Sequence, residues 1–292
     1  MFKGVYTALI TPFNKDGSID VAALKDLVEF QIEEGISGLV PVGTTGESPT
    51  VSHEENVKVV QIVVEQAKKR VPIIAGTGSN CTSEAINMTK AAREIGADAT
   101  LQVAPYYNKP SAEGFYRHFT AIADEGQLPV LIYNIPGRTG KNIDNETMLR
   151  LSAHSNIVAV KEASGDMAQV MDLCRRKPKN FDVLSGDDNL GLPIMALGGT
   201  GIVSVASNAI PRLMEQLVRL CLENKYDEAR ELHYRLLPFF KAIFLETNPI
   251  PIKYVMHLMG RCTETYRLPL CPMDEGKKDQ VKKVAKELGI LS

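Results

Sequence analysis

The chain has 292 residues, of which 44% are hydrophobic, and its 33 Lys and Arg residues against 35 Asp and Glu residues give a formal net charge of -2. This composition is typical of a globular protein, and it excludes disordered and fibrous chains. The balanced charge argues against nucleic acid as a partner, and no apolar run is long enough to span a membrane. Pro12 interrupts the N-terminal apolar segment before a signal-peptide core could form, so we expect a cytoplasmic protein.

Short β-branched runs alternate with amphipathic stretches along most of the chain. We predict eight strands, at residues 5–10, 38–42, 72–76, 100–104, 130–134, 157–161, 182–185 and 201–205. Strands that are separated by single helices run parallel, and eight such units close into an α/β fold of the (β/α)8 or TIM barrel type. A doubly wound sheet is the alternative, but it would usually have a glycine-rich turn after its first strand, where this chain has Thr11 and Pro12.

Local signals mark where the first two helices begin and end. In the segment 20–34, Asp20 can cap the first turn and Gly35 can end the helix. The next helix begins with Ser52 followed by Glu55, which is the spacing of a capping box.

The strand pattern ends near residue 208, and only helices are predicted after it. These helices are expected at residues 209–223, 227–246, 250–259 and 274–288. The first of them would complete the barrel. We therefore predict a catalytic barrel at residues 1–224 and a C-terminal α-helical extension at residues 225–292.

Lys161 ends the sixth predicted strand, directly after the apolar run 157–160. Active sites of such barrels lie at the C-terminal ends of the strands. A lysine buried there must be paired or lose its proton, and a pKa lowered from about 10.4 to roughly 7 to 8 would give a neutral amine that attacks carbonyl groups. The alternative is a structural lysine at the barrel rim or paired with an acid, although Glu162 should point to the opposite side of the strand.

Hydroxyl-bearing side chains lie near or just after the ends of other predicted strands. Tyr133, Tyr107 and Thr44 could move protons in a Schiff-base reaction. Thr44 and Thr45 also offer backbone N–H groups in a glycine-flanked turn, which suits a carboxylate. For each tyrosine the alternative is ordinary barrel packing, and for the threonines it is a simple glycine-rich turn.

Arg138 follows the fifth predicted strand, where its guanidinium could bind a substrate carboxylate with two hydrogen bonds. An exposed loop arginine without a partner is the alternative. The glycine-rich stretch 198–201 lacks the full spacing of a phosphate-binding loop. The five His and five Cys residues are scattered without the spacing of a metal site, so we expect no metal and no cofactor.

Four segments of the chain carry a resemblance to one family, and three of them are jointly specific: the Gly-x-x-Gly-Glu turn, the Tyr-Asn-x-Pro run and the lysine about 28 residues later. The segments are Gly43-Thr44-Thr45-Gly46-Glu47, Pro105-Tyr106-Tyr107, Tyr133-Asn134-Ile135-Pro136-Gly137-Arg138-Thr139 and Lys161. In this combination the chain resembles the dihydrodipicolinate synthase / N-acetylneuraminate lyase family over essentially its whole length. The resemblance implies a class I aldolase reaction of the diaminopimelate route to lysine. In it, Lys161 condenses with pyruvate to an iminium and then an enamine, which attacks the aldehyde of L-aspartate 4-semialdehyde.

Two other functions stay open at this point. The family's sugar-acid lyases share Lys161 and the Tyr-Asn-x-Pro run but generally lack the Gly-Arg-Thr that contains Arg138, so the synthase is favoured over a pyruvate-dependent lyase of N-acetylneuraminate or a 2-keto-3-deoxy acid. A non-catalytic or phosphate-binding barrel, with Lys161 as a structural residue, is the third alternative.

The resemblance assigns roles to the residues of the site. It implies that Tyr133, Thr44 and Tyr107 form a proton relay, with Tyr107 contributed by a neighbouring subunit. Members of the family are usually tetramers built from two tight dimers, so we expect a homo-oligomer.

The same resemblance implies four substrate-binding residues. Thr45 would hold the pyruvate carboxylate, and Gly186 and Val203 would line the pyruvate pocket. Arg138 would bind the carboxylate end of the semialdehyde.

The resemblance also implies a second site, at a dimer interface, for L-lysine as an effector. The matching residues are Ser48, His53, Asn80, Glu84 and Tyr106. Asn56 departs from the His or Glu that relatives inhibited by lysine often have, and Pro49 is a further variation. The resemblance therefore does not fix how strongly lysine inhibits.

Overall fold

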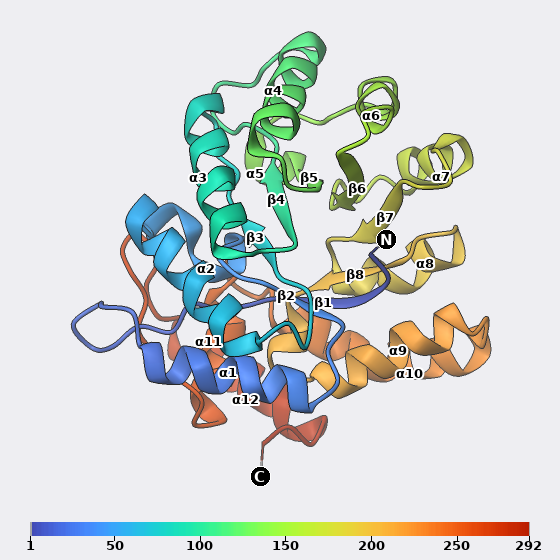
Figure 1. Ribbon diagram of the computed structural model, residues 1–292. Coiled ribbons are helices and arrows are strands. Elements are labelled where there is room, and N and C mark those ends of the chain that lie inside the picture. Colours follow the sequence, from blue (N-terminus) through green and yellow to red (C-terminus); the bar gives the residue numbers. More distant parts are fainter. Residues whose placement is uncertain (1, 292) are drawn as a thin grey trace.

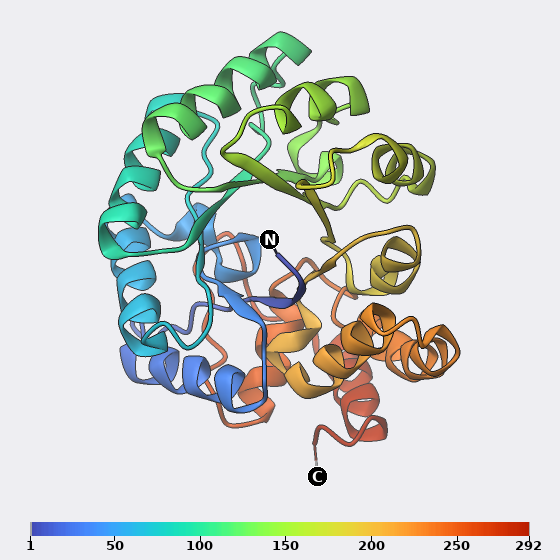
Figure 2. The ribbon, with the colours of Figure 1, turned by 45° about the vertical axis from the view of Figure 1, so that its right-hand side comes forward.

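The computed structural model describes residues 2–291 and contains one sheet of eight parallel strands. The strands are β1 (Gly4–Ala8), β2 (Gly38–Val40), β3 (Ile74–Gly76), β4 (Ala99–Val103), β5 (Val130–Asn134), β6 (Ile157–Glu162), β7 (Asp182–Ser185) and β8 (Gly201–Ser204). They follow the order β2-β1-β8-β7-β6-β5-β4-β3, and a parallel bridge between Leu39 and Ile73 joins the two edges. The predicted (β/α)8 barrel is thus confirmed, and Figure 2 shows its strands as a ring with helices around it.

Helices surround the strands on the outside, as Figure 1 shows. They are α1 (Val21–Glu33), α2 (His53–Ala67), α3 (Thr82–Ile95), α4 (Ala112–Gly126), α6 (Asn145–Ser152), α7 (Met167–Arg176), α8 (Gly191–Ala196) and α9 (Pro211–Leu222). The predicted caps are confirmed: the Asp20 side chain accepts a hydrogen bond from the N–H of Ala23, and Ser52 and Glu55 form the capping box at the start of α2.

Several predicted boundaries differ from those in the structure, and one short helix was not predicted. The second strand was expected to reach residue 42 but ends at Val40, because Val42 has a left-handed φ of 54° that turns the chain out of the sheet. A four-residue helix, α5 (Pro136–Thr139), directly follows β5 in a segment that the sequence analysis left as a loop.

Apolar side chains fill the inside of the barrel as a packed core. Their cluster includes Tyr6, Val40, Leu131, Tyr133, Leu184 and Val203. Two further clusters lie between the strands and the surrounding helices. This filled interior leaves the strand ends as the place for chemistry.

The chain after α9 forms α10 (Tyr226–Ala242), α11 (Ile250–Leu258) and α12 (Glu275–Glu287). The predicted helix at 227–246 therefore ends earlier, at Ala242, and residues 243–249 form a loop that brings Asn248 to the barrel. Phe239 of α10, Val255 of α11 and Val281 of α12 share one hydrophobic cluster with barrel residues. The boundary between residues 1–224 and 225–292 stays a prediction, and we call residues 225–292 the C-terminal extension below.

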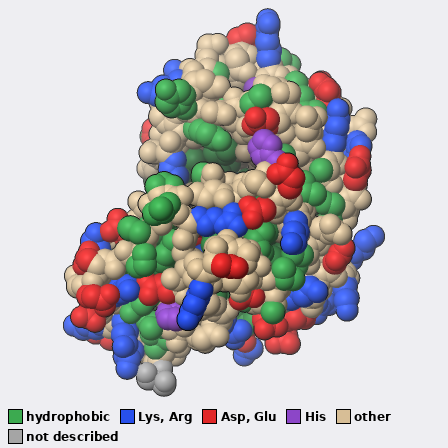
Figure 3. Space-filling model, turned by 90° about the vertical axis from the view of Figure 1, so that its left-hand side faces the viewer, with side chains coloured by type: hydrophobic (Ala, Val, Ile, Leu, Met, Phe, Trp, Pro, Cys, Tyr) green, Lys and Arg blue, Asp and Glu red, His purple; other side chains and the backbone are tan. Residues whose placement is uncertain are grey.

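The surface carries both signs of charge. On the face that Figure 3 shows, Lys and Arg side chains are interspersed with Asp and Glu side chains, with apolar patches between them. None of the helices within residues 2–291 is both long enough and apolar enough to cross a bilayer.

Candidate active site

Lys161 extends from β6 into the interior of the barrel. Its side chain is only 4% exposed, and its Nζ lies 3.9 Å from the centroid of the Tyr133 ring. The two residues are register partners on the neighbouring strands β5 and β6. Glu162 points to the opposite side of the strand, as expected, where it accepts hydrogen bonds from the Asn134 amide and the N–H of Ser164.

Burial is the main influence on the Lys161 amine. It lowers the pKa of Lys161 to about 8, although the negative charges of Asp187 and Asp188 partly oppose this effect. Neither carboxylate contributes a hydrogen bond to the amine. About a tenth of the Lys161 amine is therefore neutral at pH 7, against less than a thousandth at the ordinary lysine pKa of about 10.4.

Tyr133 and Thr44 form a pair of hydroxyl groups beside this amine. Burial raises the pKa of Tyr133, while a hydrogen bond with Thr44 acts in the opposite direction. The phenol is thus protonated at neutral pH and can pass a proton on. A cavity of about 30 Å³, lined in part by Thr44 and Tyr133, adjoins the pair and has room for a water molecule.

The segment 43–48, which we call the catalytic turn, holds Thr44 and Thr45. Its backbone is tied by hydrogen bonds from the N–H groups of Gly46 and Ser48 to the carbonyl of Gly43. Thr45 is 2% exposed, and its hydroxyl accepts a hydrogen bond from the Asn248 amide at 3.0 Å. The backbone of the predicted glycine-rich turn is thus hydrogen-bonded within itself, and both threonine hydroxyls have hydrogen-bond partners.

Gly186 leaves the space that Lys161 occupies. A Cβ atom at this position would lie 2.7 Å from the Ala163 Cβ and 3.1 Å from the Lys161 Cε. A side chain at this position would therefore clash with Ala163 and crowd the Lys161 side chain. Val203, which is fully buried, lies on β8 in the same interior cluster as Tyr133.

Arg138 lies in α5, immediately after β5, with an exposed side chain. Its guanidinium donates a hydrogen bond to the backbone carbonyl of Asn248 at 3.1 Å. The positive charge of Arg138 also lowers the pKa values of Lys161 and Tyr133, so this predicted residue belongs to the electrostatic surroundings of the buried amine.

Tyr107 is the one predicted catalytic residue that a single chain does not bring to Lys161. It lies on the loop after β4, has a left-handed φ of 69°, and is 90% exposed. Its contribution from a neighbouring subunit stays a prediction.

Sequence reasoning missed Asn248 near the site, and it placed Asp188 at the end of the seventh strand without a role. Asn248 links Thr45 to Arg138, and its buried Oδ1 has no hydrogen-bond partner among the described residues. Asp188 accepts hydrogen bonds from the N–H groups of Val205 and Ala206, just after β8, and burial raises its pKa to about 6. The only sequence signal for Asn248 was the proline that follows it.

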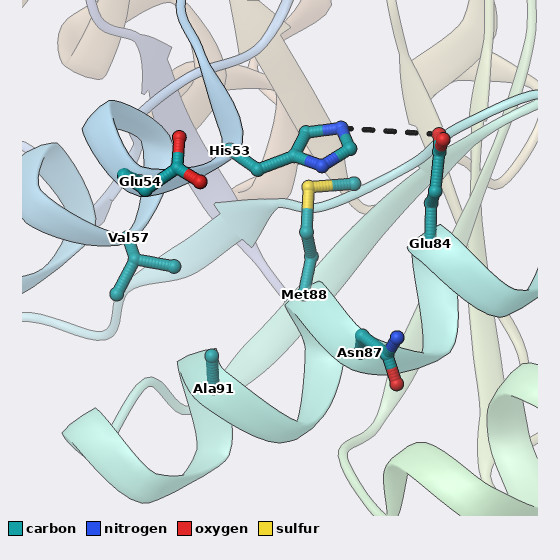
Figure 4. A pocket seen from close by; sticks show the side chains of 7 residues that line it. All are labelled: His53, Glu54, Val57, Glu84, Asn87, Met88 and Ala91. Carbon is teal, nitrogen blue, oxygen red and sulfur yellow. Dashed lines mark ion pairs between the residues drawn. The ribbon is translucent and has the colours of Figure 1, made fainter.

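The residues predicted to bind lysine fall into three neighbouring groups. His53 and Glu84 line a cavity of about 440 Å³ between α2 and α3, with His53 Nε2 at 3.8 Å from Glu84 Oε2 (Figure 4). The Asn80 amide donates a hydrogen bond to the backbone carbonyl of Tyr106 at 3.2 Å. Ser48 lines the small cavity beside Thr44.

Asn56, where the sequence departs from the lysine-inhibited pattern, does not line the cavity between α2 and α3. Its side chain is buried and donates a hydrogen bond to the carbonyl of Gly76 on β3. Among residues 2–291, no group of three or more His, Cys, Asp or Glu side chains is arranged to hold a metal ion.

Comparison with known proteins gives consistent matches over the full length. The family model described as the dihydrodipicolinate synthetase family matches residues 1–288. The 4-hydroxy-tetrahydrodipicolinate synthase of Koribacter versatilis (strain Ellin345) is 53% identical over 290 residues, covering 99% of this chain and 97% of that protein.

Two solved structures are similar in both sequence and fold. The chloride-inhibited dihydrodipicolinate synthase of Acinetobacter baumannii, complexed with pyruvate, is 42% identical with a TM-score of 0.98, and the match covers 100% of each chain. The enzyme of Cyanidioschyzon merolae, solved with lysine bound, is 39% identical with a TM-score of 0.97, and the match covers 99% of each chain.

Proposed function

The chain belongs to the dihydrodipicolinate synthetase family, and from this membership and the geometry around Lys161 we propose that it acts as a 4-hydroxy-tetrahydrodipicolinate synthase. The reaction is a class I aldolase-type condensation of pyruvate with L-aspartate 4-semialdehyde. Relatives that carry this activity in their names match the chain over its full length, which favours the synthase over a sugar-acid lyase.

The observation that carries the proposal is the buried amine of Lys161. The neutral amine attacks the keto carbon of pyruvate, and loss of water from the resulting carbinolamine gives an iminium. Removal of a proton from the pyruvate methyl group gives an enamine, whose carbon attacks the aldehyde of the semialdehyde. The amino group that the semialdehyde brought to the adduct then attacks the former keto carbon. This closes the ring and releases Lys161 as a free amine.

Tyr133 and Thr44 serve as the proton relay for these steps. Tyr133 is in contact with Lys161 through its ring and with Thr44 through its hydroxyl. This chain of groups can deliver a proton to the leaving water and take one back in the next step. Tyr107 of a neighbouring subunit completes the relay in this proposal.

Two separate groups bind the two substrate carboxylates. Thr45 is buried and binds the pyruvate carboxylate, and Gly186 and Val203 line the space for the rest of this substrate. Arg138 is exposed at the mouth and binds the carboxylate of the incoming semialdehyde, because a guanidinium matches a carboxylate with two hydrogen bonds.

A homo-oligomer follows from the role of Tyr107. We propose a tetramer built from two tight dimers, in which each exposed Tyr107 enters the partner's site. A cytoplasmic location is part of the same proposal.

L-lysine is the proposed effector, bound by Ser48, His53, Asn80, Glu84 and Tyr106. The lysine-bound relative supports this, and Glu84 offers a carboxylate for an ammonium group. Asn56 is engaged by Gly76 and is not free to join the ligand, so we expect weak inhibition. Titration with lysine should lower the activity gradually, and a flat response up to millimolar lysine would contradict the effector site.

Turnover with alternative substrates tests the proposed reaction. The purified enzyme should condense pyruvate with L-aspartate 4-semialdehyde in a coupled spectrophotometric assay. It should not release pyruvate from N-acetylneuraminate or from a 2-keto-3-deoxy sugar acid at a comparable rate. Faster cleavage of a sugar acid than condensation with the semialdehyde would replace the synthase with the lyase.

A further inference from the structure

A buried ion pair connects the catalytic turn to the C-terminal extension. Glu47 follows Gly46 in the turn and has a left-handed φ of 57°, which is uncommon for a residue with a side chain. Its Oε1 lies 2.5 Å from the Nζ of Lys253 on α11, and both side chains are 0% exposed. The two residues are 206 positions apart in the sequence.

Aromatic rings and the backbone of Arg267 lie around this pair. The Lys253 amine lies 4.2 Å from the centroid of the Phe13 ring and 5.4 Å from that of Tyr266. The second carboxylate oxygen of Glu47 accepts a hydrogen bond from the backbone N–H of Arg267 at 3.3 Å. Both partners are thus held in one geometry.

Stability alone is a weak explanation for such a pair. The cost of removing two charges from water offsets much of their attraction, so well-packed apolar residues often stabilise a core equally well. Burial correspondingly lowers the pKa of Lys253. What an ion pair adds is a fixed direction between two groups, and here Glu47 lies in the same turn as the threonines, two residues after Thr45.

A second contact reaches the same turn from the same segment. The Asn248 amide, five residues before Lys253, donates a hydrogen bond to the Thr45 hydroxyl at 3.0 Å. On the barrel side, Thr11 Oγ1 donates to the carbonyl of Gly46 at 2.7 Å. The turn is therefore held between the barrel and the segment 248–253.

We propose that the Glu47–Lys253 ion pair positions the catalytic turn, so that the C-terminal extension sets the orientation of the Thr44 and Thr45 hydroxyls toward Lys161. Glu47 and Lys253 are positioning residues in this inference, since neither touches a substrate. The inference rests on the proposed function, because Thr45 is the ligand of the pyruvate carboxylate and Thr44 belongs to the relay.

A selective kinetic effect distinguishes positioning from folding. Removing Lys253 alone would leave an unpaired buried carboxylate, so the main variant combines Glu47→Gln with Lys253→Met and removes both charges together. Active sites are counted by borohydride trapping with pyruvate. The control combines Glu264→Gln with Lys278→Met and removes both charges of another ion pair in the extension.

We expect the double variant to lose about tenfold in kcat per trapped site and to need several-fold more pyruvate for half-saturation, because small misplacements of positioned groups are costly. Its KM for the semialdehyde should stay within about twofold of wild type, since Arg138 is untouched. The control should match wild type in all three constants.

Wild-type values of kcat and of the pyruvate KM in the double variant would overturn the inference, and so would an equal loss in the control. A double variant that traps no pyruvate at all would also overturn it, because the pair would then be needed for folding. A wild-type enzyme that traps no pyruvate would instead overturn the proposed function.

Discussion

The reactivity of Lys161 depends on its protonation state. Its pKa of about 8 means that the amine is mostly protonated below that pH and mostly free above it. The value of kcat/KM for pyruvate should therefore rise with pH, about tenfold per unit on the acidic side, and level off above pH 8. A flat profile between about pH 6 and pH 9 would contradict a titrating nucleophile.

Arg138 should matter for one substrate only. Replacing it in Arg138→Ala removes charge-assisted hydrogen bonds to the semialdehyde carboxylate, and we expect the KM for the semialdehyde to rise about ten- to a hundredfold. The KM for pyruvate should change little, because Thr45 binds that carboxylate. Steady-state kinetics with each substrate varied in turn measures both effects.

A surface arginine provides the control for this prediction. Arg235 on α10 is also exposed, and Arg235→Ala should leave both KM values at wild-type levels. Unchanged semialdehyde kinetics in Arg138→Ala would favour a substrate that carries no carboxylate at that end.

At the scale of elements, the strands and the helix caps were predictable from the sequence because local patterns determine them. All eight strands were found, and the caps at Asp20 and Ser52 formed as expected, because period, burial and capping depend on residues close together in the chain. The end of β2 was misplaced because nothing in the sequence revealed the left-handed conformation of Val42.

Contacts between distant parts of the chain were not predictable in this way. Lys161, Tyr133 and Thr44 were singled out because strand ends meet in a barrel. The contacts of Asn248 and the Glu47–Lys253 pair were not predicted, because they join segments about 200 residues apart. The sequence pattern predicted the helices of the C-terminal extension but not how they pack on the barrel. Tyr107 could be placed at a strand end, but a single chain leaves it at the surface.

The capping box of α2 should contribute stability without affecting chemistry. In Ser52→Ala, the N–H of Glu55 loses its acceptor, and we expect the free energy of unfolding to fall by about 1 kcal/mol. Urea denaturation measures this change. Ser155→Ala, at an exposed serine outside any helix or strand, is the control, and equal midpoints for the two variants would contradict the capping role.

At the scale of the whole molecule, the site is expected to be complete only in an oligomer. A subunit with Lys161→Ala still carries Tyr107, and a subunit with Tyr107→Phe still carries Lys161. After mixed dissociation and reassociation of the two variants, the hybrid should contain one restored site and exceed the summed activity of the separate variants.

The control for this experiment mixes two single variants whose substituted residues both belong to the same subunit's part of the site. Lys161 and Tyr133 both belong to the same barrel, so mixing Lys161→Ala with Tyr133→Phe should restore nothing. Equal outcomes for the two mixtures would show that Tyr107 does not cross between subunits.

The covalent bond between Lys161 and pyruvate is the most direct test of the whole account. The enzyme is incubated with pyruvate, reduced with borohydride and digested, and the peptides are analysed by mass spectrometry. We predict one reduced pyruvate adduct, located on Lys161 and missing in Lys161→Ala, which should also lose all but about a thousandth of its turnover. An adduct on another lysine, or an unmodified and fully active enzyme, would contradict the central claim.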